Sequence, residues 1–218
     1  MVGTLLKIHL RESWLVIAGI QACCLVGCTT NSPSTARQAI CCSPASEATT
    51  ATGRLFFEID SLWETDAGQR VRLDELRGRP QIVAMFYSSC HVACPLTIQT
   101  MKWIESKLPE SSRSRIGFLL ITFDPADDTP RALRTFRKAE QLNGNHWTLL
   151  RGSVAETKKA AAILGVSFKK ESFRLTHTSQ IAVLDAEGRM IFRQENLRAS
   201  PDDAFEAVQS LLSAPHSP

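Results

Sequence analysis

Two continuous runs of apolar residues constrain the fold of this chain more than any other feature of its sequence. Residues 82–87 read IVAMFY, and residues 116–123 read IGFLLITF. An uninterrupted apolar run of this length is typical of a strand that is buried on both faces, whereas a strand with one wet face alternates apolar and polar residues. Both runs are therefore expected to be central strands of a sheet that is covered on each side.

Helical patterns lie between and after these runs. Thr129 followed by Pro130 is an N-cap with a first-turn proline, and Ser153 with Glu156 forms a capping box, so both pairs mark the start of a helix. Gly165 is expected to end the second of these helices. An earlier helix over residues 95–108 is indicated by apolar side chains at helical spacing, namely Leu96, Ile98, Met101, Ile104 and Leu108.

The order of elements changes in the last third of the chain. IAVLD at 181–185 and RMIFR at 189–193 are expected to pair as a β-hairpin, and a final amphipathic helix is expected to begin at Ser200. A βαβ half followed by a ββα half is the order of a thioredoxin-like α/β sandwich. We therefore expect one domain at 53–213, with a central mixed β-sheet flanked by helices, and a short tail at 214–218.

The N-terminal residues are typical of a bacterial lipoprotein signal peptide. Lys7 and Arg11 precede an apolar run at 14–27 that is too short and too interrupted to span a bilayer comfortably, and the run ends in Leu-Val-Gly directly before Cys28. This ending predicts removal of residues 1–27 and lipidation of Cys28; an uncleaved membrane anchor is the alternative. Two or three acyl chains anchor a protein stably. We expect a lipid-anchored protein of the bacterial cell envelope whose domain faces the periplasm.

Residues 28–52 consist largely of Ser, Thr, Ala and Pro, which is the composition of a flexible tether. Cys41 and Cys42 lie side by side in this tether, either as surface thiols or a strained vicinal disulfide, or with an accessory metal or redox role. The formal net charge of +3 becomes about +2 once residues 1–27 are removed. A charge this small indicates no nucleic-acid partner.

The stretch YSSCHVACP at 87–95 places Cys90 and Cys94 just beyond the first buried run. Such a pair can act as a redox dithiol, bind a metal or form a structural disulfide. A disulfide here would close a very small loop and would restrict the unfolded chain little. Backbone N–H groups at the start of the following helix favour thiolate over thiol, so both cysteines are expected to be good nucleophiles and good ligands for a soft metal.

His177 is the candidate third ligand, because a thioredoxin fold brings the loop before the C-terminal hairpin against the cysteines. Its neighbours are Thr176 and Thr178, so the cis-proline that redox members carry in this loop is absent. Two thiolates and an imidazole suit copper, since sulfur stabilises Cu(I) and the imidazole makes the site tolerable for Cu(II). Zinc accepts the same donors and normally takes a fourth.

Three motifs in this order resemble the Sco/SenC family of thioredoxin-fold copper chaperones. They are Cys90-x-x-x-Cys94-Pro95, FDPADDTP at 123–130, and His177 followed by a hairpin with LDAEGR at 184–189. The resemblance runs from about Leu55 to Leu212. It implies that Cys90, Cys94 and His177 bind copper, as Cu(I), Cu(II) or both. It further implies assembly of the copper A centre of cytochrome c oxidase subunit II, or service to another copper protein of the envelope.

The sequence departs from the family pattern on both sides of the site. Many members have Cys-Pro-Asp-Val-Cys-Pro where this chain has His91, Val92 and Ala93 between its cysteines, and many have aspartate where Thr176 stands. The loss of these acidic groups is expected to lower the affinity for Cu(II). His91 is either an extra ligand or an exposed loop residue, and the resemblance implies that Asp124 lies near the copper.

Two mechanisms use the same residues. A copper carrier exchanges ligands with client thiolates and catalyses no bond cleavage, so it is not an enzyme in the usual sense. A thiol-disulfide reductase instead attacks a client disulfide with Cys90 and resolves the mixed disulfide with Cys94. We expect the carrier to depend on His177 and the reductase to retain most of its disulfide exchange without it.

Overall fold

The computed structural model describes residues 55–90, 93–171, 174–196 and 198–214. These residues belong to one compact unit, Glu47–Pro218. The predicted signal peptide, Cys28, the tether with Cys41 and Cys42, and His91 lie outside the described residues. Among the residues that are described, no helix combines the length and the apolar character needed to cross a membrane.

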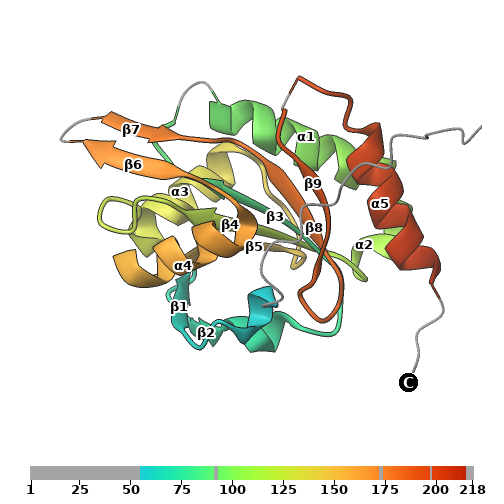
Figure 1. Cartoon of the computed structure of the whole chain (residues 1–218), viewed down its shortest axis with the longest axis horizontal. Helices are drawn as coiled ribbons and strands as arrows, with labels where there is room; N and C mark the ends of the chain where they lie inside the picture. Colours follow the sequence, from blue (N-terminus) through green and yellow to red (C-terminus); the bar gives the residue numbers. More distant parts are fainter. Residues whose placement is uncertain (1–54, 91–92, 172–173, 197, 215–218) are drawn as a thin grey trace, which may run out of the picture. The chain divides into compact units, whose positions relative to one another are not determined.

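A seven-stranded mixed β-sheet forms the centre of this unit (Figure 1). Its strands, in their order across the sheet, are β2 Arg70–Arg72, β1 Leu62–Thr65, β5 Trp147–Arg151, β4 Gly117–Thr122, β3 Gln81–Phe86, β8 Ile181–Leu184 and β9 Met190–Gln194. β4 is parallel to both β3 and β5, and β8 joins the other edge of β3 in the antiparallel direction. The predicted central mixed sheet is confirmed.

The two apolar runs are the central strands β3 and β4, and every residue of both strands is buried. Alternate side chains of β3 enter different hydrophobic clusters. Ile82, Ala84 and Phe86 pack on one face of the sheet, and Val83 and Met85 pack on the other. A strand that supplies both clusters can carry no polar side chain in its interior, which explains the unbroken apolar sequence.

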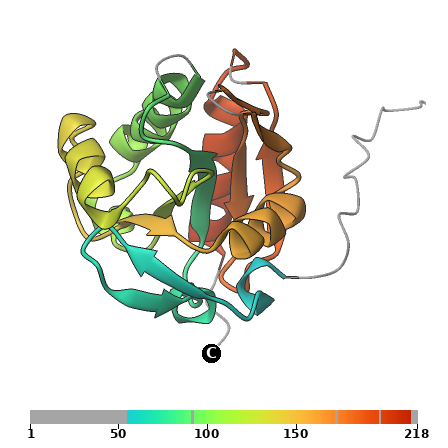
Figure 2. The ribbon, with the colours of Figure 1, turned by 90° about the vertical axis from the view of Figure 1, so that its left-hand side faces the viewer.

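Helices cover both faces of the sheet. They are η1 Phe56–Glu58, η2 Leu73–Leu76, α1 Ala93–Lys107, α2 Glu110–Arg113, α3 Pro130–Ala139, α4 Val154–Leu164 and α5 Asp202–Ser213. The cluster on one face includes side chains of α1, α3 and α5, and the cluster on the other face includes those of η1, η2 and α4. Figure 2 shows α1 and α4 apart from each other, with strands of the sheet between them.

The predicted helix boundaries at the two capping motifs are confirmed. The Thr129 hydroxyl accepts a hydrogen bond from the Ala132 N–H at 3.3 Å. Ser153 and Glu156 exchange the two bonds of a capping box, and Gly165 ends α4 in the left-handed conformation with φ 74°. Each motif satisfies backbone groups that a helix end leaves without partners.

A second hairpin precedes β8, and the sequence analysis did not predict it. Strands β6 Phe168–Glu171 and β7 Arg174–His177 form a separate two-stranded sheet, in which Phe168 lies opposite His177 (Figure 1). Phe168 and Leu175 pack against the cluster on the α4 face of the main sheet. His177 was expected in a loop directly before β8; it is instead the last residue of β7.

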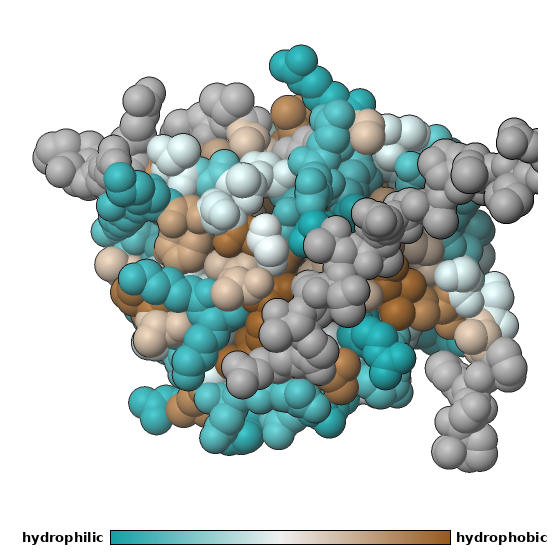
Figure 3. Space-filling model, viewed as in Figure 1, coloured by the Kyte–Doolittle hydropathy of each residue, from teal (hydrophilic) through white to brown (hydrophobic). Residues whose placement is uncertain are grey.

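Hydrophobic residues are visible between hydrophilic ones on the face shown in Figure 3. The large hydrophobic side chains that are exposed among the described residues are Leu62, Leu96, Val154 and Ile191. They belong to four different elements, β1, α1, α4 and β9. Leu96 lies in α1, the helix that also contains Cys94, but is exposed where Cys94 is buried.

Gly188→Ala tests the turn between β8 and β9. Gly188 has φ 92°, and a methyl group on its Cα would lie 2.6 Å from Cδ2 of Phe57 and 2.9 Å from the Phe57 backbone nitrogen. The substitution is expected to lower the free energy of unfolding by about 2–3 kcal/mol, because backbone strain and overlap both oppose it. Urea denaturation measures the change. Glu187→Ala, at an exposed position of the same turn, is the control and should lose much less; equal losses would contradict this explanation.

Candidate metal centre

The cysteine pair lies where β3 gives way to α1. The Cys90 N–H donates to the Tyr87 carbonyl at 3.1 Å, which turns the chain after the strand. The Cys94 N–H donates to Sγ of Cys90 at 3.3 Å, so the start of α1 supplies a backbone donor to the first sulfur, as predicted. Helix α1 begins at Ala93, two residues earlier than expected, and Cys94 is therefore inside it. No disulfide joins the two cysteines.

His177 completes a group of three ligands with these cysteines. One ligand atom from each of Cys90, Cys94 and His177 can be chosen such that all three atoms lie within 4.8 Å of one another. Cys94 is 1% exposed and Cys90 is 8% exposed, whereas His177 is half-buried. The structure thus places together all three predicted ligands, although the cysteines and the histidine are about 80 residues apart in the sequence.

Neighbouring groups orient the imidazole of His177. Its Nδ1 lies 3.2 Å from the Thr178 carbonyl oxygen and 3.3 Å from Oγ of Ser179. A carbonyl oxygen can only accept a hydrogen bond, so this contact assigns the ring proton to Nδ1 and leaves the lone pair on Nε2 for a metal. A metal-binding histidine is commonly fixed in this way through its other nitrogen.

Two aromatic rings support the same imidazole. The Phe123 ring lies 4.8 Å from the His177 ring between centroids, and the Tyr87 ring meets it edge-on at 5.6 Å. Burial, followed by a hydrogen bond with Cys90, raises the pKa of Tyr87. Tyr87 therefore interacts with both Cys90 and His177.

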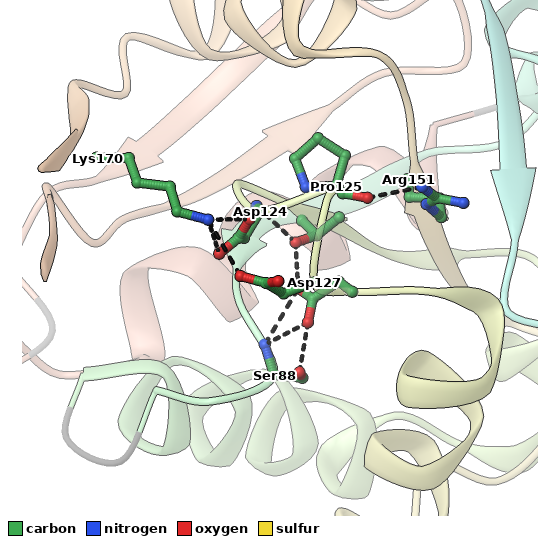
Figure 4. Close-up of polar contacts among 8 residues, drawn as sticks. Ser88, Asp124, Pro125, Asp127, Arg151 and Lys170 are labelled. Carbon is green, nitrogen blue, oxygen red and sulfur yellow. Dashed lines mark hydrogen bonds and ion pairs between the residues drawn. The ribbon is translucent and has the colours of Figure 1, made fainter. Parts of the chain in front are cut away.

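The segment 124–130, which follows β4, holds the cysteine loop in place. Both carboxylate oxygens of Asp128 lie 3.2 Å from the Ser88 N–H, and the Ser88 and Thr122 hydroxyls also donate to this carboxylate (Figure 4). Asp128 is 2% exposed; its burial raises its pKa, although these three donors oppose the change. Ser88 precedes Cys90 by two residues, so Asp128 fixes the approach to the first ligand.

The same segment also holds the hairpin that carries His177. Asp124 lies 2.7 Å from Nζ of Lys170 through each carboxylate oxygen, and Asp127 lies 3.1 Å from the same nitrogen (Figure 4). Lys170 belongs to β6. Asp124 is thus buried at the end of β4 and paired with a cation, and it is not one of the three clustered ligands.

The acidic residue that Thr176 replaces would lie on the other side of the hairpin. Thr176 is exposed and pairs with Lys169, whereas His177 pairs with Phe168. Successive side chains of a strand point to opposite faces. The departure at Thr176 therefore changes charge on the face of β7 that turns away from the imidazole. The other departure, at His91, lies outside the described residues.

The thiol of Cys94 differs from the sequence-based expectation. Burial, with a hydrogen bond to Cys90 as the next cause, raises the pKa of Cys94 well above its ordinary value, whereas the helix start was expected to favour its thiolate. Desolvation penalises the charged form and outweighs the backbone groups here. Without a metal, Cys94 is therefore a protonated thiol at neutral pH, and metal binding must release its proton.

The donor set suits a soft ion of low coordination number. Two sulfurs and one imidazole nitrogen are ligands that Cu(I) accepts, and zinc in a structural site would take a fourth. Among the described residues, the cluster contains no fourth histidine, cysteine or carboxylate. The arrangement fits copper better than zinc.

Comparisons with known proteins place this site in a family. The family model described as SCO1/SenC matches residues 58–213. A putative copper-binding protein of Stutzerimonas stutzeri is 25% identical over 122 residues, which cover 54% of this chain and 58% of that protein. The SCO1 protein homolog of Bacillus subtilis (strain 168) is 22% identical over 162 residues, covering 72% of this chain and 83% of the relative. The chain thus spans less than two thirds of the first relative and most of the second.

Solved structures with the same fold include Sco proteins. ScoI of Bradyrhizobium japonicum, solved with copper bound, superposes with a TM-score of 0.59 at 22% identity and covers 69% of this chain and 96% of its own. BsSco, described as a member of the Sco family of cytochrome c oxidase assembly proteins, gives 0.61 at 22% identity over 71% of this chain and 92% of its own. These likenesses confirm the predicted thioredoxin-like fold.

Alkylation kinetics test the protonation of Cys94. In the unit 47–218 carrying Cys90→Ser, Cys94 is the one remaining thiol. Its reaction with iodoacetamide is expected to accelerate well above pH 9, because the thiolate is the reacting form and burial keeps the thiol protonated. In urea, the alkylation rate of the same protein should level off above the ordinary thiol pKa of about 8.5. If the alkylation rate of the folded protein levels off at the same pH as that of the unfolded protein, the raised pKa is contradicted.

Proposed function

This chain belongs to the SCO1/SenC family, and we propose that it is a copper chaperone that receives, holds and hands over one copper ion. The observation that carries the proposal is the convergence of Cys90, Cys94 and His177, whose ligand atoms lie within 4.8 Å of one another. The relatives support copper as the ion, since one is named a putative copper-binding protein and another was solved with copper bound.

Ligand exchange is the mechanism that the geometry supports. His177 is half-buried and lies on a separate hairpin, whereas Cys94 is 1% exposed inside α1. A client thiolate therefore reaches the copper most easily from the His177 side and displaces the imidazole first. Cys94 then releases the copper last and takes up a proton as it does so, because its pKa is raised. Each bond from copper to a carrier ligand is replaced by a bond to a client ligand, and the copper keeps its oxidation state, so no electron is needed.

The client in this proposal is the copper-bearing subunit II of cytochrome c oxidase, or another copper protein of the envelope. BsSco supports it, because that structure is described within a family of cytochrome c oxidase assembly proteins. The exposed Leu96, in the helix that contains Cys94, offers an apolar contact for such a client.

The proposal also includes a lipid anchor at Cys28 and a place in the bacterial envelope. It rests on the Leu-Val-Gly-Cys ending of the apolar run and on the Ser- and Thr-rich residues that follow. A tether of this kind would let the copper-binding domain reach a client in the same membrane.

A thiol-disulfide reductase is the second candidate. One observation favours it: the Cys94 N–H donates to Sγ of Cys90, which stabilises a thiolate on the residue that would attack a client disulfide. Cys94 would then resolve the mixed disulfide. The oxidised pair that results would need an external dithiol to reduce it again. A disulfide switch is described for BsSco.

Copper titration under anaerobic conditions tests the carrier. The reduced unit 47–218 is expected to hold one copper against a competing chelator. Cys90→Ser and His177→Ala should each lower the copper affinity by more than about 100-fold. This loss exceeds the usual effect of changing a residue that only orients a ligand. His146→Ala is the matched control, because His146 pairs with Glu105 and is not part of the cluster.

Either result of this titration is informative. Copper that is lost in both ligand variants and kept in the control supports the carrier. A wild-type unit that yields its copper to the chelator would overturn the carrier and favour the reductase, whose disulfide exchange should survive in His177→Ala.

A further inference from the structure

We propose that Lys170 is a positioning residue of the copper centre, which keeps the imidazole of His177 within reach of the metal by holding the β6–β7 hairpin to the end of β4. The inference rests on the proposed copper-binding function. Lys170 is not one of the three clustered ligands, and it lies outside the three family motifs.

The contacts of Lys170 join two parts of the chain that are far apart in sequence. Nζ of Lys170 lies 2.7 Å from both carboxylate oxygens of Asp124 and 3.1 Å from Asp127, 46 and 43 residues away (Figure 4). One ammonium group thus bridges two carboxylates of segment 124–130. The hydrogen bond with Asp124 is the main cause that raises the pKa of Lys170, and the lysine is therefore charged at neutral pH.

The register of the hairpin connects this ion pair to the ligand. Phe168 lies opposite His177, and Lys170 is two residues beyond Phe168 on the same strand. Side chains two apart on a strand share a face, so Lys170, Phe168 and His177 all face the end of β4. Phe123 lies 5.2 Å from the Phe168 ring and 4.8 Å from the His177 ring between centroids.

The end of β4 therefore holds this face of the hairpin by two different interactions. Phe123 packs on Phe168 and His177, and the next residue, Asp124, pairs with Lys170. The packing is not directional, whereas the ion pair fixes how far β6 lies from β4. Without the ion pair, this face of the hairpin would be held by apolar packing, that of Phe168, Leu175 and His177, which would let the hairpin slide over Phe123 and the imidazole move with it.

The burial of Asp124 makes the loss of Lys170 costly. The Asp124 side chain is 11% exposed, and Asp127 lies close enough to contact the same ammonium. Removal of the lysine would leave two neighbouring carboxylates with no cation between them, one of them nearly buried. Asp124 would then need water, and water that entered to reach it would draw the end of β4 and the hairpin apart.

The two oxidation states of copper respond differently to such a displacement. Cu(I) is held well by the two thiolates, whereas Cu(II) depends on the imidazole. Lys170→Met is therefore expected to weaken Cu(II) binding by on the order of tenfold and Cu(I) binding by less, as for other groups that orient a ligand. The nitrogen coupling of His177 in the electron paramagnetic resonance spectrum of the Cu(II) form should weaken as well.

The experiment compares Cu(I) and Cu(II) affinities of the unit 47–218, each against a chelator, for the wild type, Lys170→Met and four further variants. Lys170→Arg keeps the charge, so its Cu(II) affinity should be close to that of the wild type. Lys158→Met removes the same charge from an exposed position on α4 and is the matched control. The pair His177→Ala and Lys170→Met with His177→Ala forms a double-mutant cycle. Circular dichroism of the copper-free variants shows that each one is folded.

The inference is supported if Lys170→Met lowers the Cu(II) affinity more than the Cu(I) affinity and has no further effect once His177 is alanine. Equal losses for both ions, additive with His177→Ala, would show that Lys170 serves only the fold. Tighter Cu(II) binding in Lys170→Met would show that the lysine acts by its charge and not by position, which also overturns the inference.

Failure of the proposed function gives a different result. If the wild-type unit holds neither ion against the chelator, the carrier and the inference both fall. If the wild type binds and Lys170→Met binds equally well in both states, the inference alone falls.

Discussion

The copper-binding site depends on the hydrogen bonds and the ion pair that segment 124–130 makes to the two parts of the chain carrying the ligands. Asp128, buried at one end of the segment, accepts hydrogen bonds from Ser88 in the cysteine loop. Asp124, at the other end, pairs with Lys170 of the histidine hairpin. The cysteine loop and the hairpin are separated by about half of the domain in sequence, and they are attached to one short turn in space. The acidic residues of this segment thus serve to hold protein groups together.

Hydrophobic pattern and capping chemistry were sufficient to predict the centre of the fold. The runs at 82–87 and 116–123 are β3 and β4, and the capping residues Thr129 and Ser153 begin α3 and α4. These signals are local, because a buried strand or a helix start is determined by residues within one or two turns of chain. The hairpin β6–β7 was missed because its strands are short and polar on one side, and its stability comes from packing on Phe123 and pairing with Asp124.

The three candidate ligands that the structure brings together could be predicted, and most of the groups that position them could not. Cys90, Cys94 and His177 are chemically distinctive residues at recognisable places in the fold. Ser88, Tyr87 and Lys170 are common residues whose roles arise from contacts with partners in distant parts of the sequence; the partners of Ser88 and Lys170 lie 40 and 46 residues away. The ionisation of Cys94 was predicted in the wrong direction for a related reason. The helix start is visible in the sequence, whereas the burial that outweighs it is a property of the folded core.

The distance along the chain between Cys94 and His177 gives a bound metal a second physical effect. An ion held by both residues cross-links positions about 80 residues apart and so closes a large loop that an unfolded chain would otherwise leave open. By the chain-entropy relation used for disulfides, a permanent link of this length is worth about 4–5 kcal/mol. Bound copper therefore acts as a reversible cross-link in this domain. The loaded protein would resist unfolding and proteolysis, and delivery of the metal would return the domain to its more easily degraded form.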